Sequence, residues 1–260
     1  MLRTLLLGLA MLAGCSVMPE VVAPDVVRDL APTGTLRAAI NYGNSVLAQR
    51  EPSGSEGRGV SVDLAHELAR RLGVPLELVT YDAAGKVTGD AKSGRWDIAF
   101  VARDPERAKD IEFSPPYVII EGGYVVPANS PLKTIEDVER EGVRISVSRG
   151  SAYDLYLSRV LKRAQLVRAP SPAASVELFV SDRLDALAGV KAPLVEYAAT
   201  HPEVRVLPGR FMVIEQAMAV PRGRPLAARY VRDFIDEMKA SGFVAASLEK
   251  SGQREAIVAP

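Results

Sequence analysis

Two arginines in one short acidic stretch have the type and spacing expected of a binding site. Arg103 and Arg107 lie in ARDPERAKDIEFSPPY, residues 102–117, among four acids. If both arginines paired with neighbouring acids, this segment would be an exposed turn. A guanidinium without such a pair suits an external ligand, because its planar fork matches both oxygens of a carboxylate.

A second stretch, ISVSRGSAYDL at residues 145–155, predicts a site for an anion. Gly150 permits a tight turn after a strand, and Ser151 is a predicted helix N-cap with Asp154 at the third helical position. The N–H groups of a first helical turn carry partial positive charge and suit a carboxylate or a phosphate. The alternative, commoner for such a pattern alone, is that Ser151 only caps the helix.

Catalytic and metal-binding motifs are absent from the sequence. It has two histidines, His66 and His201, one cysteine, and neither HExxH nor GxSxG. The glycine cluster at 54–59 does not lead from a strand into a helix, so it indicates a hairpin turn rather than a phosphate-binding loop. We therefore expect no catalytic residue, no metal and no cofactor.

Charge and length restrict the possible partners and the number of domains. Lys and Arg total 32, as do Asp and Glu, and no basic block is present, so nucleic-acid binding is not expected. The 260 residues suit one large domain or two modest ones.

The N-terminal segment predicts export. Residues 1–14, MLRTLLLGLAMLAG, combine one cation with a short apolar run, as in a signal peptide. Leu12–Cys15 is similar to the bacterial lipobox, in which the cysteine receives a lipid anchor; an ordinary signal peptide with a chance cysteine is the alternative. Residues 15–33 contain three prolines and are expected to form a semi-extended tether. These features predict a periplasmic or cell-envelope protein anchored to a membrane.

From Thr35 onward, predicted strands and helices alternate. VDLAHELARRL at 62–72 carries one leucine stripe and ends at Gly73, whereas WDIAFVA at 96–102 is a continuous apolar strand. Residues 83–94 predict a weaker helix, and RPLAARYVRDFIDEMKAS at 224–241 a long one with Leu226, Tyr230, Phe234 and Met238 at four-residue steps. This alternation indicates an α/β fold with parallel strands.

The segment WDIAFVARDPERAKDIEFSPPY resembles the signature of bacterial solute-binding proteins of family 3, the receptors of amino-acid ABC importers. GTLRAAI, GVSVDLAHELARRLGV, GVRISVSRGSAYDLYL and RLDALAGV follow the family's order, so the resemblance covers about Gly34 to Gly252. It implies the two-lobed periplasmic-binding-protein fold of type II, in which each lobe is a mixed sheet flanked by helices.

The resemblance also implies a division of the chain. Lobe 1 is expected at 34–122 plus 217–252, lobe 2 at 123–216, and a C-terminal tail at 253–260. Two crossing strands are expected near 120–124 and 215–219. The ligand of such proteins lies between the lobes, which close on it by a hinge motion.

Residue by residue, the resemblance assigns Arg107 to the family arginine that forms a bidentate pair with the ligand's α-carboxylate. Gly150 and Ser151 match residues that meet the same carboxylate from the second lobe. Arg103 is expected at the surface, paired with Asp104. The expected ligand contacts are Asn41, Tyr42, Asn44, Phe100, Ala102, Arg107, Gly150, Ser151 and Glu215.

Three departures from the family pattern put the usual ligand in doubt. The family's Gly-Met-Thr is Phe100-Val101-Ala102, and its aromatic-rich loop is the polar 41–44. Val190 replaces the acid that receives the ligand's ammonium group. The ligand is therefore a carboxylate that need not be a standard α-amino acid, with Glu215 either a replacement charge or a surface acid.

Three functions remain open for such a chain. The first is a monomeric receptor that passes a small carboxylate-bearing solute to an ABC permease. The second is an enzyme similar to cyclohexadienyl dehydratase, which would require a general acid in the cleft. The third is a ligand-sensing adaptor for a membrane signalling protein. Neighbouring genes for a permease and an ATPase would separate the first from the third.

Overall fold

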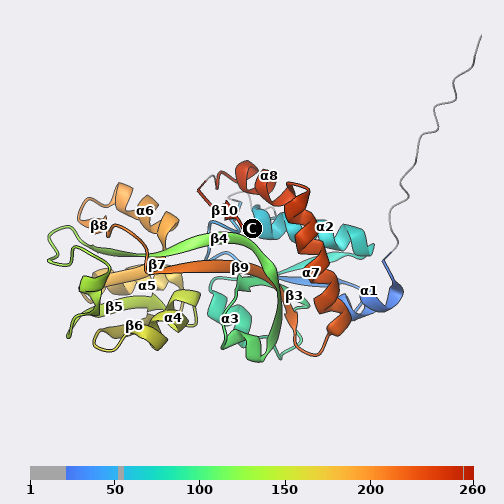
Figure 1. The fold of residues 1–260 in the computed structure, drawn as a ribbon, viewed down its shortest axis with the longest axis horizontal. Helices are drawn as coiled ribbons and strands as arrows, with labels where there is room; N and C mark the ends of the chain where they lie inside the picture. Colours follow the sequence, from blue (N-terminus) through green and yellow to red (C-terminus); the bar gives the residue numbers. More distant parts are fainter. Residues whose placement is uncertain (1–21, 52–55, 254) are drawn as a thin grey trace, which may run out of the picture.

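Two long antiparallel strands join the two halves of the molecule. The structure is a computed structural model that describes residues 22–51, 56–253 and 255–260. β4 (Ile111–Pro127) and β9 (Met212–Pro221) pair from Ile111 opposite Pro221 to Gly122 opposite Met212. They run between the halves in Figure 1. Their positions confirm the two expected crossing strands.

Each half extends this pair into a mixed sheet. The strand order is β2-β1-β3-β9-β4-β7-β5-β6, and within each half the outer three strands are parallel. We call the half with β1 (Leu36–Asn41), β2 (Leu76–Tyr81) and β3 (Ile98–Ala102) lobe 1. Lobe 2 is the half with β5 (Arg144–Ser148), β6 (Gln165–Ala169) and β7 (Ala186–Val190). The expected α/β class is confirmed.

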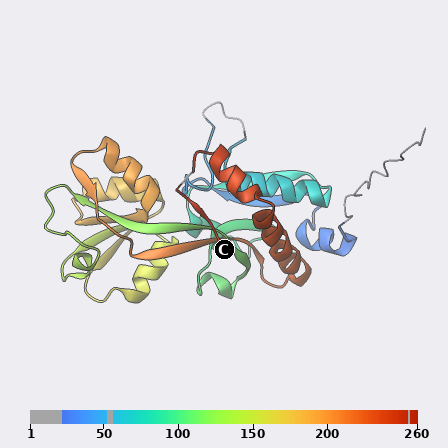
Figure 2. The same cartoon turned by 45° about the horizontal axis from the view of Figure 1, so that its top comes forward.

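Helices cover the sheet in both lobes. In Figure 2, α2, α7 and α8 lie together on one side of lobe 1, and α1 lies against α7. The lobe 1 helices are α1 (Pro24–Leu30), α2 (Val60–Leu72), α3 (Ala84–Gly89), α7 (Pro225–Ala240) and α8 (Phe243–Lys250). Lobe 2 holds α4 (Ala152–Val160), α5 (Pro172–Ser181), α6 (Lys191–Thr200) and the short strand β8 (Val204–Val206). Single 3-10 turns are η1 (Arg107–Lys109) and η2 (Glu136–Glu139).

The periodic spacing of apolar residues predicts the buried face of α2 correctly and that of α7 with one error. On α2, Leu64, Leu68 and Leu72 are buried, and the helix ends at Gly73 with φ 65°, as predicted. On α7 the buried face contains Val231, Phe234, Ile235 and Met238, whereas Leu226 is 40% exposed. A strict four-residue step drifts around a helix of 3.6 residues per turn, so the predicted stripe was wrong at its first member.

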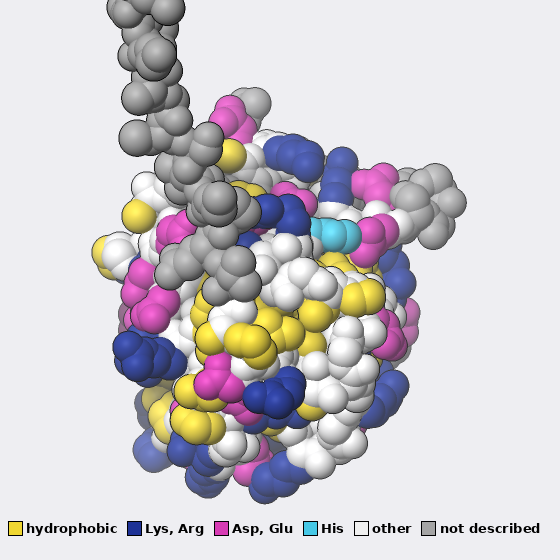
Figure 3. Space-filling model, turned by 90° about the vertical axis from the view of Figure 1, so that its right-hand side faces the viewer, with side chains coloured by type: hydrophobic (Ala, Val, Ile, Leu, Met, Phe, Trp, Pro, Cys, Tyr) yellow, Lys and Arg dark blue, Asp and Glu magenta, His cyan; other side chains and the backbone are white. Residues whose placement is uncertain are grey.

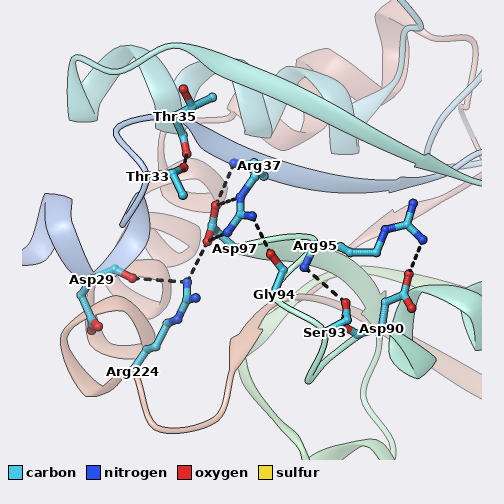
Figure 4. Close-up of polar contacts among 10 residues, drawn as sticks. All are labelled: Asp29, Thr33, Thr35, Arg37, Asp90, Ser93, Gly94, Arg95, Asp97 and Arg224. Carbon is cyan, nitrogen blue, oxygen red and sulfur yellow. Dashed lines mark hydrogen bonds and ion pairs between the residues drawn. The ribbon is translucent and has the colours of Figure 1, made fainter.

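Asp97, which follows Trp96 and directly precedes β3, has a structural role (Figure 4). Asp97 is fully buried and accepts hydrogen bonds from Arg37 Nε and Nη2, both at 2.8 Å, and from Arg224 Nη1 at 3.0 Å. The Asp29 carboxylate accepts from the backbone N–H of Ala227 at 2.8 Å. These contacts connect β1, β3 and α1 to the start of α7.

Both ends of the described chain differ from expectation. Residues 24–30 form α1, not an extended tether: Pro24 occupies the first helical turn, where proline is tolerated, and Leu30 is fully buried. Within 253–260, β10 (Ile257–Val258) pairs antiparallel with β4, so this segment is more than a tail.

Surface charges are mixed, and membrane-spanning helices are not found in the described ranges. On the end of lobe 1 seen in Figure 3, Lys and Arg side chains alternate with Asp and Glu over the surface. None of the helices within residues 22–51, 56–253 and 255–260 has the length and apolar character needed to span a membrane.

Candidate functional site

A cavity of about 220 Å³ lies between the two lobes and against β9. Lobe 1 contributes the end of β1, the end of β3 and Arg107; lobe 2 contributes the starts of α4 and α5, the end of β7 and α6. Ile214 and Gln216 of β9 complete the wall. The cavity therefore lies at the carboxyl ends of parallel strands from both lobes, where open α/β sheets bind ligands.

Arg107 is a buried cation that forms no ion pair with any acid that the structure describes. It lies in η1 and is 5% exposed. Nη1 donates to the carbonyl oxygen of Ala102 at 2.8 Å, and Nη2 donates across the lobes to that of Gly150 at 2.9 Å. Nε has no partner within the described ranges. Burial lowers the pKa of Arg107 to about 10, and nearby Asp104 only partly opposes this, so the guanidinium is charged at neutral pH.

Arg103 has the surface position expected, but its partner is different. Its Nη1 lies 3.1 Å from a carboxylate oxygen of Glu215, and both side chains are about half exposed. Asp104 is buried and instead accepts from Arg159 Nη2 of α4 at 2.9 Å. The predicted Arg103–Asp104 pair is therefore wrong. After an extended strand, successive side chains point to opposite sides, so neighbours of opposite charge need not meet.

The turn before α4 has the predicted capping geometry. Ser151 Oγ accepts from the backbone N–H of Asp154 at 3.0 Å, and Asp154 Oδ2 accepts from the N–H of Gly150 at 2.8 Å. Gly150 has φ +69°, which favours glycine, and its Cα lies close to Gly85 of lobe 1. Ser151 lines the cavity, while Gly150 contributes the carbonyl that holds Arg107.

The other expected contacts divide into two groups. Asn41, Asn44, Phe100 and Ala102 line the cavity, and Asn44 Oδ1 is buried without a partner in the described part of the chain. Tyr42 does not line it; Arg50 lies over the Tyr42 ring, 4.5 Å from its centroid.

Glu215 is also absent from the cavity wall, because its side chain lies on the outer side of β9 beside Arg103. Of the two alternatives for Glu215, a replacement charge or a surface acid, this placement matches the surface acid. Gln216, the next residue, lines the cavity and is 5% exposed. Strand alternation could have indicated Gln216 once Glu215 was placed outside.

Sequence reasoning also missed most of the wall from lobe 2. Val176 of α5 and Leu194 and Tyr197 of α6 line it. The sequence around α6 has weak apolar periodicity, so no local signal identified Leu194 or Tyr197. Val190 at the end of β7, which was expected to replace the family's acid, also lines the cavity. This side of the cavity is largely apolar.

The chemistry of the site favours binding of an anion over metal or acid–base chemistry. Of the side chains placed by the structure, no group of three or more His, Cys, Asp or Glu could hold a metal ion. Among the described residues that line the cavity, there is neither an acid nor a histidine. A carboxylate could meet Arg107 and the N-terminus of α4 together.

Comparisons with known proteins agree with this architecture. The arginine-binding protein of T. maritima, as its P235GK mutant, has a TM-score of 0.75 and 23% identity over 88% of this chain and 100% of that one. The solute receptor for L-cysteine of Neisseria gonorrhoeae has a TM-score of 0.76 and 24% identity, and the match covers 86% of this chain and 92% of that one. An ancestral amino-acid-binding protein, described as a precursor of cyclohexadienyl dehydratase, has a TM-score of 0.72 and 25% identity. This match covers 86% of this chain and 98% of that one.

The curated proteins contain no match to this sequence. Residues 38–253, however, match the family described as bacterial extracellular solute-binding proteins, family 3. This range includes β3, Arg107, both crossing strands and the α4 N-terminus. The chain therefore belongs to family 3 of the bacterial extracellular solute-binding proteins.

Proposed function

We propose that this protein binds a small carboxylate-bearing solute between its lobes and delivers it to an ABC importer. The observation that carries the proposal is Arg107, which is buried in the cavity wall and, among the described residues, hydrogen-bonded only to two carbonyl oxygens. A buried cation without a counter-ion is costly, and a bound carboxylate would offset that cost. Amino-acid-binding proteins among the similar structures support the same class of ligand.

Hinge closure is the proposed delivery step, with lobe 1 at 34–122 plus 217–252 and lobe 2 at 123–216. Three of the contacts between the lobes lie away from the crossing strands: Arg107 to the Gly150 carbonyl, Arg159 to Asp104, and the close approach of Gly85 to Gly150. β4 and β9 are continuous between the lobes, so bending these two strands would separate all three contacts.

An enzymatic role is less well supported. One similar structure is a precursor of cyclohexadienyl dehydratase, and dehydration requires a group that donates a proton to the departing hydroxyl. The cavity wall, as far as the structure describes it, has no Asp, Glu or His side chain. This composition favours binding without turnover.

A lipid anchor at Cys15 remains part of the proposal, with a signal peptide at 1–14, a periplasmic location and a monomeric protein that meets a permease at the membrane. These N-terminal residues lie outside those that the structure describes. Cys15→Ser should leave the protein unprocessed or release it from the membrane fraction, because a lipid chain contributes about 0.8 kcal/mol per buried CH₂. A processed variant that still sediments with membranes would contradict the anchor.

A thermal-shift screen followed by calorimetry tests the binding proposal. The panel contains amino acids, 2-oxo acids, 2-hydroxy acids and small dicarboxylates, with the corresponding primary amides as uncharged controls. A ligand that binds only the folded state raises the unfolding midpoint. We expect at least one carboxylate to do so and its amide not to. If no carboxylate shifts the midpoint, or the amides act equally well, the proposal is wrong.

A further inference from the structure

We infer that the ligand is a monocarboxylate without an ammonium group, with an apolar body and a neutral oxo or hydroxyl group. This inference rests on the proposed function and specifies its ligand. It follows from the charges that line the cavity, the engagement of the surrounding acids, and the polar groups left available.

The cavity offers one charge. Arg107 is the only charged side chain among the described residues that line it. A monocarboxylate would match that single cation, leaving no net charge in the closed site. An α-amino acid would add an ammonium group with no anion opposite it, and burying an unpaired charge is strongly unfavourable.

Five acids near the cavity are held by other cations. The pairs are Asp82–Lys86 at 2.8 Å, Asp104–Arg159 at 2.9 Å, Glu121–Lys191 at 3.0 Å, Asp154–Arg168 at 2.9 Å and Glu215–Arg103 at 3.1 Å. None of these acids lines the cavity. An ammonium group could recruit one of these five only by breaking an existing ion pair.

Glu121 is the acid that the backbone places near Val190, since Gly122 pairs with Val190 across β4 and β7. Its two carboxylate oxygens are occupied by Lys191 and by Arg210, the latter at 2.5 Å. Both cations lower the pKa of Glu121. Glu121 is therefore a fixed, neutralised anion at the outer side of the site.

At the end of β7, where an acid would meet an ammonium group, the wall is apolar. Val190 lines the cavity together with Pro193, Leu194 and Tyr197 of α6. This surface would accommodate a hydrocarbon or aromatic body. Because Val190 is both the last residue of β7 and the N-cap of α6, its side chain position is fixed by two elements.

Neutral polar groups remain for the rest of the ligand. Asn44 is 8% exposed, and its Oδ1 has no partner in the described ranges. A carboxamide can accept a hydrogen bond from a hydroxyl or, after rotation, donate one to an oxo group. Gln216, 5% exposed on β9, offers the same two possibilities.

Matched ligand sets test this inference by calorimetric titration of the processed protein. Each set keeps the carbon skeleton and changes only the α-substituent: phenylalanine, phenylpyruvate and phenyllactate; leucine, 4-methyl-2-oxopentanoate and 2-hydroxy-4-methylpentanoate; alanine, pyruvate and lactate. In the set that binds most tightly, we expect the oxo or hydroxy acid to bind at least tenfold more tightly than the amino acid.

Val190→Asp provides a second, independent readout. An aspartate there supplies the missing anion, so the variant should reverse the preference and bind the amino acid more tightly than its oxo acid. Val190→Asn is the matched control, because it has similar size and polarity without the charge. It should not gain affinity for the amino acid, and unfolding midpoints establish that both variants are folded.

The outcomes separate this inference from the proposed function. An amino acid that binds the wild type as tightly as its oxo and hydroxy analogues overturns the inference and leaves the carboxylate receptor intact. A Val190→Asp variant that is folded and keeps the wild-type preference also contradicts it. If no carboxylate of the sets or of the wider panel binds, the proposed function fails together with the inference.

Discussion

At the scale of single residues, two neighbours on β9 have opposite environments. Glu215 is exposed and paired with Arg103, whereas Gln216 is buried at the cavity. The sequence drew attention to Glu215 because it carries a charge. Charge does not show which face of a strand a side chain occupies; that depends on the strand's register within the folded sheet.

Exchanging an acid and an amide at these two positions tests the assignment. Gln216→Glu would place a carboxylate beside the bound anion, so we expect at least tenfold weaker binding at pH 7. Lower pH should restore part of the affinity, because burial raises the pKa of such a carboxyl and protonation removes the repulsion. Glu215→Gln is the control and should change the affinity less than twofold, as measured by calorimetry. The reverse pattern would contradict the placement of β9.

At the scale of elements, the sequence predicted those with strong local patterns. α2, β3 and the cap of α4 followed from a leucine stripe, an apolar run and a Ser-Asp capping pattern. α1 was missed because the three prolines of residues 15–33 indicated an extended chain, whereas the helix packs against α7 and buries Leu30. α6 and α8 were missed too; α6 in particular has no strong one-sided pattern. Such helices are stabilised by tertiary contacts more than by local propensity.

An ion-pair network joins α2 to α7 and gives a pH-dependent prediction. Glu67 accepts hydrogen bonds from Arg70 and Arg71, and Arg71 also binds Glu237 of α7 through Nη1 at 2.6 Å and Nη2 at 2.7 Å. These arginines lower the pKa of Glu67 from 4.5 to about 2. Because the pKa of Glu67 is lower in the folded than in the unfolded protein, its ionised form stabilises the fold at pH values above about 4.5. This stabilisation is lost as the pH falls from about 4.5 towards 2.

We therefore expect Glu67→Gln to lower the free energy of unfolding by about 1 kcal/mol at pH 7, since the pair is partly screened by solvent. The difference in the free energy of unfolding between the variant and the wild type should shrink as the pH is lowered from 4.5 to 2.5. Urea unfolding at several pH values measures it. Glu106→Gln, at the exposed pair with Lys109, is the control and should cost less than about 0.5 kcal/mol. An equal loss at pH 7 and pH 2.5 would show that the charge of Glu67 is not responsible.

At the scale of the whole molecule, the cavity exists only because the two lobes and the crossing strands come together. Arg107 and the α4 N-terminus could be predicted because each lies in a recognisable local segment. Leu194 and Tyr197 could not, since they reach the cavity from a segment distant in the chain. The partner of Arg159, Asp104 in the other lobe, is likewise determined by how the lobes meet.

Substitutions at two glycines of α3, Gly85 and Gly89, test whether the lobes close on the ligand. A Cβ at Gly85 of α3 would lie 2.4 Å from the Arg149 carbonyl oxygen of lobe 2, whereas a Cβ at Gly89 would have no atom within 4 Å. Gly85→Ala should therefore hold the lobes apart, weaken ligand binding at least tenfold and reduce the ligand-induced decrease in the radius of gyration. Gly89→Ala should bind as the wild type does.

Calorimetric titration and X-ray scattering measure both effects. Both variants replace a glycine of α3 by alanine, so the comparison removes the part of the effect that the two substitutions share. Equal affinity and equal compaction in the two variants would contradict closure at the Gly85–Gly150 contact.

Arg107 is proposed to bind the carboxylate of the ligand. Calorimetric titration of three variants with the tightest-binding carboxylate from the screen tests this role. Arg107→Ala should weaken binding by about 2–5 kcal/mol, roughly thirty-fold to several thousand-fold, because the anion would be buried without a partner. Arg107→Lys should recover only part of this, since an ammonium group cannot form two parallel bonds. Arg103→Ala removes an equal charge from the exposed pair with Glu215 and should leave affinity unchanged. If Arg107→Ala binds as the wild type does while Arg103→Ala loses the ligand, the assignment of the site is wrong.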